Sequence, residues 1–270
     1  MSLKRRLDEL LFGLGLSESR TKAAELIRSG KVTVDGMIVL KPGYKVDSDR
    51  EIVASNSFMP VGRGYYKLKK AIDEFRIKPE GRRVLDVGAS TGGFAQLLLE
   101  NGAASVICVD VGKDQISNKL KEDSRILSVE STDIRDFSIE QFGGEVDLLT
   151  ADLSFISTAG LAELFRMFLK DNGEAVVLIK PQFEVGPGVV KKGLVRSRMA
   201  HREVIEVFVK AFVSSGMFPV GITFSPIKGK RGNIEYLLYS VAGETFVELD
   251  YDYLIEKAFA FFDRDSNQLV

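Results

Sequence analysis

The segment from Asp86 to Phe94 has the composition of a ligand-binding turn: a carboxylate, three glycines and several small side chains that follow an apolar run. Glycine lets a backbone turn tightly and approach a ligand closely, and a helix that begins at Phe94 would supply free N–H donors. A dinucleotide is disfavoured, because Ser90 stands where the G-x-G-x-x-G fingerprint requires its middle glycine. A P-loop is excluded, since no Gly-Lys-Ser/Thr closes the turn. The alternative is a tight strand-to-helix turn that binds no ligand.

A second candidate ligand residue ends the next apolar run. Asp110 follows Ala104–Val109 and lies 24 positions after Asp86. A Rossmann-like unit places at this point the carboxylate that hydrogen-bonds ribose hydroxyls. Asp110 could equally cap the helix that follows. Taken with the glycine turn, however, it predicts a ligand that contains ribose.

The pattern that remains, D-x-G-x-x-x-G-G, resembles motif I of the S-adenosylmethionine (SAM)-dependent methyltransferases. The resemblance implies SAM as the cofactor, with the turn curled around its methionine part. Asp133, within Thr132–Asp136, falls where such enzymes carry a polar residue that faces the adenine. The cofactor-binding residues implied are Asp86, Gly88, Ser90, Gly92, Gly93, Phe94, Asp110 and Asp133.

Four further polar residues stand where predicted strands or helices begin or end: Lys67, Asp152, Lys180 and Glu235. Open α/β sheets bind ligands outside the carboxyl ends of their strands, so Asp152 and Lys180 should flank the glycine turn. Each residue alone has an ordinary explanation. The lysines could be solvated ends of elements, Asp152 could cap a helix, and Glu235 could join a surface ion pair.

The elements that must position these residues are apolar strands alternating with helices, typical of an α/β fold with a Rossmann-like sheet. The first sixty residues form a separate, basic module. Residues 1–78 carry 16 Lys/Arg against 10 Asp/Glu, whereas the rest of the chain carries 21 against 28. Two amphipathic helices, broken at Gly15 and capped at Ser17 or Ser19, precede a strand, an Asp35-Gly36 turn and a second strand. We therefore predict domains at 1–60, which includes a linker, and at 61–270.

The front module, with its pattern R-L-D-x-L-L…S-R-x-x-A-x-x-L-I-x-x-G-x-V-x-V-D-G over residues 3–50, resembles the α+β S4 RNA-binding domain. The resemblance implies that cations of its helix pair contact RNA phosphates, which position a protein without reading sequence. The candidates are Arg5, Arg6, Arg20, Lys22, Arg28 and Lys31. Because the module has no aromatic stacking pair, we expect it to recognise a folded RNA shape.

The composition narrows the remaining classes of protein. A single cysteine, Cys108, excludes an internal disulfide, and no run of eighteen apolar residues or signal-like start appears. We therefore expect a cytoplasmic protein without a membrane partner. His201 is the only histidine and no Cys/His cluster exists, so a metal site is not expected.

Lys67, Asp152, Lys180 and Glu235, called the tetrad below, together resemble the Lys-Asp-Lys-Glu set of the RrmJ/FtsJ-type 2′-O-ribose methyltransferases. With the S4 module and the motifs A-D-L-S-F-I and I-K-P-Q-F-E, nearly the whole chain resembles the TlyA-type ribosomal RNA 2′-O-methyltransferases, historically labelled hemolysins. The resemblance implies methyl transfer from SAM to a ribose 2′-hydroxyl of ribosomal RNA or a ribosomal subunit. Lys180 would accept the proton or activate the hydroxyl, Asp152 and Lys67 would orient it, and Glu235 would anchor Lys67 or the ribose.

Alternative functions differ in what they require. A pseudouridine synthase can also carry an S4 module, but it would not need the cofactor turn. A non-catalytic RNA-binding protein or a hemolysin-like protein remains the alternative from another class. The basic, glycine-rich segment Glu184–Gly193 predicts either a mobile loop that closes over RNA or a plain surface loop. The nucleotide modified, the subunit and the oligomeric state are left open.

Overall fold

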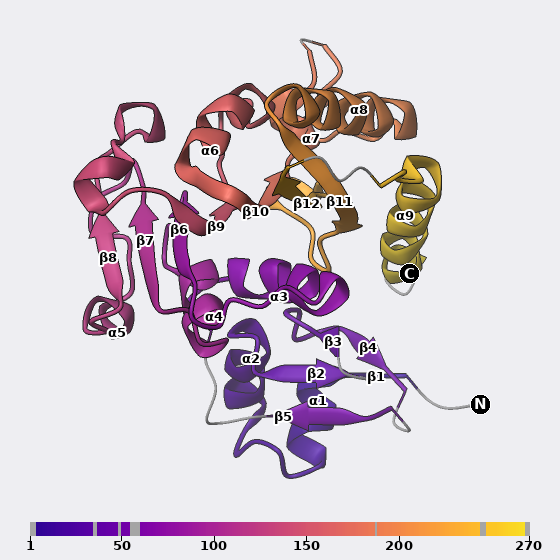
Figure 1. Cartoon of the computed structure of the whole chain (residues 1–270). Helices are drawn as coiled ribbons and strands as arrows, with labels where there is room; N and C mark the ends of the chain where they lie inside the picture. The colour runs from indigo at the N-terminus through magenta and orange to yellow at the C-terminus, as the bar shows by residue number, and fades with distance from the viewer. Residues whose placement is uncertain are drawn as a thin grey trace. The chain divides into compact units, whose positions relative to one another are not determined.

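The computed structural model describes residues 4–34, 37–47, 50–54, 60–186, 188–243 and 247–267 (Figure 1). The chain divides into two compact units, one formed by Met1–Arg63 with Phe262–Val270 and the other by Gly64–Phe261. The predicted division into domains at residues 1–60 and 61–270 stays a prediction.

The N-terminal unit pairs two helices with short strands. Its helices are α1 (Leu7–Gly13) and α2 (Arg20–Arg28). Its strands are β1 (Arg5–Arg6) paired with β4 (Lys45–Val46), and β2 (Val32–Val34) between β3 (Met37–Ile38) and β5 (Ile52–Ala54). Both helices bury leucine and isoleucine side chains against Val32 and Val34, and this cluster is the core of the unit. The predicted turn residues Asp35 and Gly36 lie outside the described residues.

Two local features refine the predicted S4 helices. Ser19, rather than Ser17, caps α2, because its Oγ accepts the Lys22 N–H at 3.1 Å. Arg5 and Arg6 were predicted to belong to the helix pair, but they form β1 and pair with Val46 and Lys45. Pairing with β4 satisfies the backbone of this segment, so α1 begins only at Leu7.

The second unit is built on a seven-stranded sheet in the order β11-β12-β10-β9-β6-β7-β8. Its strands are β6 (Arg83–Val87), β7 (Ser105–Val109), β8 (Ile126–Val129), β9 (Val146–Ala151), β10 (Leu169–Ile179), β11 (Met217–Phe224) and β12 (Tyr236–Ala242). The strands from β6 to β10 are parallel, and β12 runs antiparallel to both β10 and β11. The central strands are mostly apolar and buried, as expected for strands with helices on both faces of the sheet.

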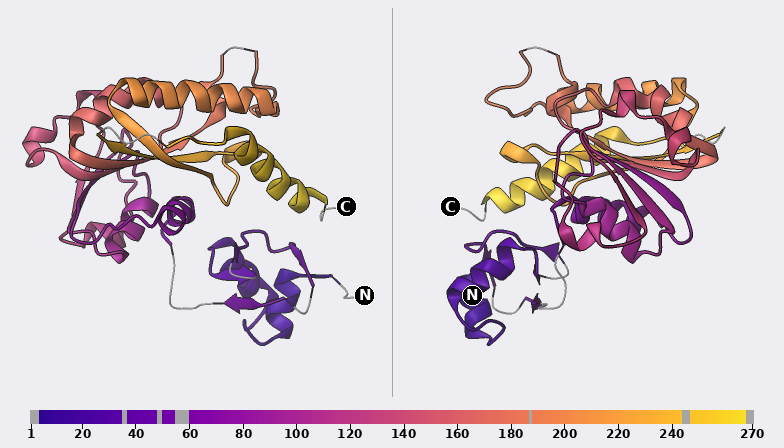
Figure 2. Two further views of the ribbon diagram at one scale, coloured as in Figure 1. Left: turned by 45° about the vertical axis from the view of Figure 1, so that its right-hand side comes forward. Right: turned by 90° about the vertical axis from the view of Figure 1, so that its left-hand side faces the viewer.

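Helices α3 (Gly64–Phe75) and α4 (Gly93–Glu100) cover one face, and α6 (Ala162–Phe168) and α8 (Arg198–Ser214) cover the other (Figures 1 and 2). The other helical segments are α5 (Asn118–Lys121), α7 (Pro181–Glu184), α9 (Tyr251–Asn267) and the short 3₁₀ turns η1 (Ile134–Asp136), η2 (Ile139–Phe142), η3 (Ala159–Leu161) and η4 (Lys230–Gly232). This arrangement is the α/β, Rossmann-like fold that the sequence predicted.

The direction of β12 determines where Glu235 lies. Ile179, the last residue of β10, pairs with Tyr236, the first residue of β12. Since the two strands are antiparallel, the start of β12 meets the carboxyl end of β10. Glu235 therefore reaches the same edge of the sheet as Asp152 and Lys180, although it precedes its strand and they follow theirs.

Candidate active site

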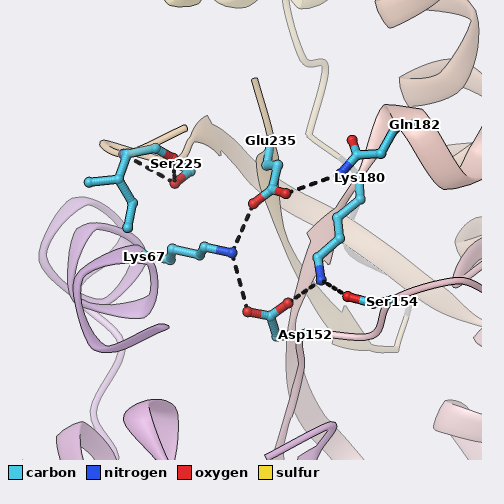
Figure 3. A network of polar contacts seen from close by, with 8 residues as sticks. Lys67, Asp152, Ser154, Lys180, Gln182, Ser225 and Glu235 are labelled. Atoms are coloured by element: carbon cyan, nitrogen blue, oxygen red, sulfur yellow. Dashed lines mark hydrogen bonds and ion pairs between the residues drawn. The ribbon is translucent and has the colours of Figure 1, made fainter. Parts of the chain in front are cut away.

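The four tetrad side chains form one continuous network of ion pairs (Figure 3). Lys67 Nζ, from the first turn of α3, donates to Glu235 Oε2 at 2.8 Å and to Asp152 Oδ2 at 3.3 Å. Lys180 Nζ lies 2.5 Å from Asp152 Oδ1, the other oxygen of that carboxylate. The network thus brings together residues from four separate segments of the chain.

Burial makes this network electrostatically strong. Burial alone would lower the pKa of Lys67, but the Asp152 and Glu235 carboxylates outweigh it and hold that pKa above its ordinary value. Burial alone would raise the pKa of Asp152, whereas Lys67 and Lys180 hold it below its ordinary value. At neutral pH Lys67 is therefore a cation and Asp152 an anion, and neither is suited to exchange a proton.

Sequence reasoning missed two residues that hydrogen-bond to the tetrad, Ser154 and Gln182, and a third, Glu184, that holds the loop after β9. Lys180 Nζ donates to Ser154 Oγ at 2.8 Å, and Gln182 Nε2 donates to Glu235 Oε1 at 3.2 Å. The Glu184 carboxylate accepts the Ser157 hydroxyl and the Thr158 N–H, both at 2.7 Å. The short helix α7, which follows β10, is therefore bonded to the loop after β9 and to Glu235 before β12. The polar residues of I-K-P-Q-F-E mark Gln182 and Glu184 as candidates, but no local pattern specifies their distant partners.

The glycine turn is shaped by packing within the protein. Gly88 has φ +79°, and a Cβ there would lie 2.8 Å from the Asp152 carbonyl oxygen. Gly92 has φ +91°, and a Cβ there would lie 2.3 Å from a Leu120 methyl group. Both glycines are therefore required by positive φ and by close neighbours. The contact at Gly88 also joins the turn directly to the tetrad strand β9.

Asp110 holds the middle of the glycine turn through a hydrogen bond to Ser90. Its carboxylate accepts the Ser90 N–H at 2.8 Å on Oδ2 and the Gly112 N–H at 2.7 Å on Oδ1. Each oxygen keeps a further lone pair, so these bonds leave capacity for the hydroxyls of a ribose. Val111 follows with its side chain 70% exposed, an apolar surface beside Asp110 that sequence reasoning missed.

Asp86 supplies the test of whether the turn fits SAM. Its side chain is 1% exposed; Thr150 Oγ1 donates to Oδ1 at 2.8 Å, and Oδ2 has no hydrogen-bond partner among the described residues. Burial, with Asp152 and Asp110 nearby, raises the pKa of Asp86 to about 7. The carboxyl groups of Asp86, Asp110 and Asp152 interact electrostatically beside the turn, and this local negative charge fits a ligand that carries positive charge, as SAM does.

Three other predicted cofactor residues occupy different surroundings. Phe94 is buried, and its ring packs against the backbone of Gly64, so its side chain belongs to the core. Gly93 is the first residue of α4, where its backbone faces the turn. The Asp133 carboxylate accepts the Arg135 N–H and pairs with the Arg135 guanidinium at 2.6 Å, which lowers the pKa of Asp133 to about 2. Its assignment to the adenine stays a prediction.

The predicted RNA-binding cations of the S4 unit fall into two groups. Arg6 pairs with Asp8, Arg20 with Asp8 and Glu9, and Lys22 with Glu18. The second group, Arg5, Arg28 and Lys31, forms no ion pair with another described residue. All six lie on β1, on α2 or immediately before β2, within one small unit.

His201 has a structural role. It is fully buried, with Nδ1 2.8 Å from the Tyr236 hydroxyl and Nε2 3.1 Å from the Val195 carbonyl oxygen. Burial lowers its pKa, so the ring is neutral and ties α8 to the start of β12. Among the described residues, no group of three or more His, Cys, Asp or Glu side chains could hold a metal ion. No described helix is both long and apolar enough to cross a membrane.

Comparison with known proteins identifies both units. The FtsJ-like methyltransferase family matches residues 60–241, and the S4 domain matches residues 5–52. The chain is 41% identical to the 16S/23S rRNA (cytidine-2′-O)-methyltransferase TlyA of Mycobacterium tuberculosis, over 88% of this chain and 90% of that protein. It is 38% identical to hemolysin A of Brachyspira hyodysenteriae, over 87% of this chain and 99% of that protein.

A solved structure agrees with these matches. A candidate hemolysin from Streptococcus thermophilus superposes with a TM-score of 0.75 at 34% identity, covering 99% of this chain and 100% of that one. The similarity therefore extends through both units, and the family resemblance inferred from the motifs is confirmed. The chain belongs to the FtsJ-like methyltransferases, as a member of the TlyA type with an N-terminal S4 domain.

Proposed function

We propose that the protein transfers a methyl group from SAM to a ribose 2′-hydroxyl of ribosomal RNA, with the S4 domain docking the RNA. The observation that carries the proposal is the tetrad: two lysines and two carboxylates in direct contact at the edge of the sheet, joined to the glycine turn through Asp152 and Gly88. The curated TlyA relatives, which methylate cytidine 2′-hydroxyls by name, support the same substrate.

The residues around the turn are suited to hold SAM. Asp110 would accept the ribose hydroxyls, Val111 would cover the adenine, and the backbone from Gly88 to Gly93 would follow the methionine part. SAM supplies an electrophilic methyl group on a sulfonium, which departs as a neutral thioether. The protein must align the acceptor hydroxyl with that methyl group and take up its proton.

Lys180 is the residue we assign to that proton. In its neutral form, Lys180 Nζ would accept the proton from the 2′-hydroxyl as the new C–O bond forms, and it would become an ammonium. Asp152 lies 2.5 Å away and would stabilise this positive charge as it develops. Lys67, held as a cation, would keep Asp152 and Glu235 in position. Lys180 contacts one carboxylate whereas Lys67 contacts two, and this difference is the reason for assigning the proton to Lys180.

The other parts of the proposal follow from the same assignment. We keep the domain division at residues 1–60 and 61–270, with the six S4 cations as phosphate contacts. Ribosomal RNA or a ribosomal subunit is the partner, and the cytoplasm, where ribosomes are assembled, is the location. No metal is needed, because SAM already carries an activated methyl group.

The test is methylation of ribosomal RNA by the purified full-length chain with SAM, followed by mapping of the modified riboses. Lys180→Ala should lower the turnover number about 10²- to 10⁴-fold and leave the Kd for SAM unchanged. If Lys180→Ala methylates as fast as wild type while SAM still binds, the assignment of the tetrad is wrong. A wild-type chain that binds SAM but places methyl groups on bases would overturn the ribose assignment.

A further inference from the structure

Two tight turns of the catalytic unit lie against each other next to the tetrad. In the first, Lys191 and Leu194 exchange backbone hydrogen bonds of 3.0 and 3.1 Å, with Lys192 at φ +53° and Gly193 at φ +82° between them. Positive φ at both central residues is the signature of a type I′ hairpin turn. Residues 191–194 therefore form a defined turn at the end of the segment for which we predicted either a mobile loop that closes over RNA or a plain surface loop.

The second turn, residues 229–233, packs directly on a tetrad carboxylate. A Cβ at Gly229 would collide with the Glu235 carboxylate, so a larger residue there would displace this side chain from its place in the tetrad. The Gly229 N–H also donates to the Asn233 carbonyl at 2.8 Å, which closes the turn. Arg231, at φ +61°, lies at its tip and is exposed.

Asn233 joins the two turns. Its side chain is buried, its Nδ2 donates to the Gly193 carbonyl at 2.7 Å, and its Oδ1 accepts the Val195 N–H at 3.0 Å. Arg231 lies over Gly193 from the other side, since a Cβ at Gly193 would be 2.5 Å from Arg231 Cδ. The first turn is thus attached to the segment that carries Glu235.

The joined turns present positive charge to solvent. Lys191, Lys192, Arg196 and Arg231, called the basic rim below, are all exposed. None of the four forms an ion pair with a carboxylate of the part of the chain that the structure describes. By contrast, Arg82, Lys170 and Arg202 of the same unit pair with acidic side chains.

We infer that the basic rim binds the phosphodiester backbone of RNA next to the target ribose. This inference rests on the proposed function, because it is the ribose presented to Lys180 that brings its flanking phosphates to the rim. A ribose within RNA carries a phosphate on each side, so the strand must pass close to Glu235 and the turns packed on it. Preformed turns present their cations without the ordering entropy that a mobile loop would lose on binding.

The rim should recognise phosphates, not bases. Lysine and arginine contacts to phosphates weaken binding uniformly across sequences when they are removed, and they lower its salt dependence. The rim therefore supplies local affinity at the reacting nucleotide, whereas the S4 domain supplies docking elsewhere on the RNA.

The test is the affinity of the full-length chain for protein-free ribosomal RNA, measured without SAM at several salt concentrations. The variant is Lys192→Asn with Arg231→Gly, because asparagine and glycine accept positive φ and should preserve both turns. We expect the Kd to rise about tenfold and the slope of log K against log salt to fall by roughly 1.4, about 0.7 for each lost single-strand contact. The Kd for SAM should not change.

A matched control removes the same charge elsewhere. Arg76 is exposed at φ +55° beyond the end of α3, and Lys210 is exposed on α8, so Arg76→Gly with Lys210→Asn changes the same residue types. This control should bind RNA like wild type. Equal affinity and slope for the rim variant and the control would overturn the inference. The inference would also be overturned if the rim variant lost affinity only for intact ribosomal subunits, because the rim would then bind a ribosomal protein.

Because binding is measured without SAM, this result is separable from the proposed function. Even if the chain fails to methylate riboses, the RNA affinities of the rim variant and the control can still be compared. A chain that methylates riboses yet shows no contrast would exclude only the rim.

Discussion

The tetrad and the S4 unit both contain ion pairs between lysine or arginine and carboxylates, but they differ in burial. Lys67 and Glu235 have side chains 10% and 2% exposed, whereas Lys22 and Glu18 are 60% and 80% exposed. Charges removed from water must be paired in a fixed geometry, since an unpaired one is very unfavourable. Exposed pairs contribute little and exchange partners easily. The buried ion pairs of the tetrad are therefore suited to hold reacting atoms in place. The exposed cations of the S4 unit are suited to leave their carboxylate partners and bind RNA phosphates instead.

The largest effect should follow from breaking the buried network. Lys67→Met leaves Glu235 and Asp152 without their shared cation, and we expect the free energy of unfolding to fall by about 3–5 kcal/mol. Activity should fall about 10²- to 10⁴-fold. Urea unfolding and methylation of ribosomal RNA measure the two effects.

Lys69→Met is the matched control for Lys67→Met. Lys69 lies on the same helix, pairs with Asp73 at 2.6 Å and is half exposed, so its loss should change stability by less than about 0.5 kcal/mol. Adding Glu235→Gln to Lys67→Met should recover part of the stability and none of the activity. If Lys67→Met is as stable as Lys69→Met, burial does not distinguish these pairs.

An intermediate effect should come from Asp86, a buried carboxyl without a cationic partner. Its pKa of about 7 in the folded chain exceeds the ordinary 3.8 of an unfolded aspartate. Between about pH 4 and pH 7 the folded chain keeps a proton that the unfolded chain has released. Its contribution to stability is therefore full below pH 4, falls by up to roughly 1.4 kcal/mol per pH unit, and is lost above pH 7.

The variant Asp86→Asn should remove this pH dependence. Its free energy of unfolding should be flatter than that of wild type between pH 4 and 7, measured by urea unfolding at each pH. Asp136→Asn, at an exposed position in η1, serves as the control and should follow wild type. Parallel curves for Asp86→Asn and wild type would show that Asp86 is not the group that titrates.

The smallest effect should follow from releasing an exposed pair. Glu18→Gln removes the carboxylate that holds Lys22, and stability should change by less than about 0.5 kcal/mol. The Kd for ribosomal RNA should fall two- to threefold at low salt, because Lys22 no longer has to leave the Glu18 carboxylate before it binds a phosphate. Fluorescence anisotropy with labelled RNA measures this change, and weaker binding by Glu18→Gln would contradict the comparison.

Much of the site was predictable because local chemistry determines it. Strand-terminal acids and lysines, such as Asp152 and Lys180, follow from apolar runs and from the rule that parallel strands end at one edge. The positioning residues were not predictable in this way. Gln182 and Glu184 act on residues 53 and 26 positions away, and no local pattern specifies such partners.

The amino-acid sequence by itself determined the fold class, the S4 module and the residues that could bind a cofactor or act on a ribose. These depend on periodicity, turn residues and motif spacing, which are local properties of the chain. The tertiary structure alone decided that Lys67 bridges two carboxylates, that Asp86 is buried without a cation, and that Arg231 packs over Gly193. Those facts depend on the antiparallel direction of β12 and on burial, which set distance and dielectric between groups far apart in sequence.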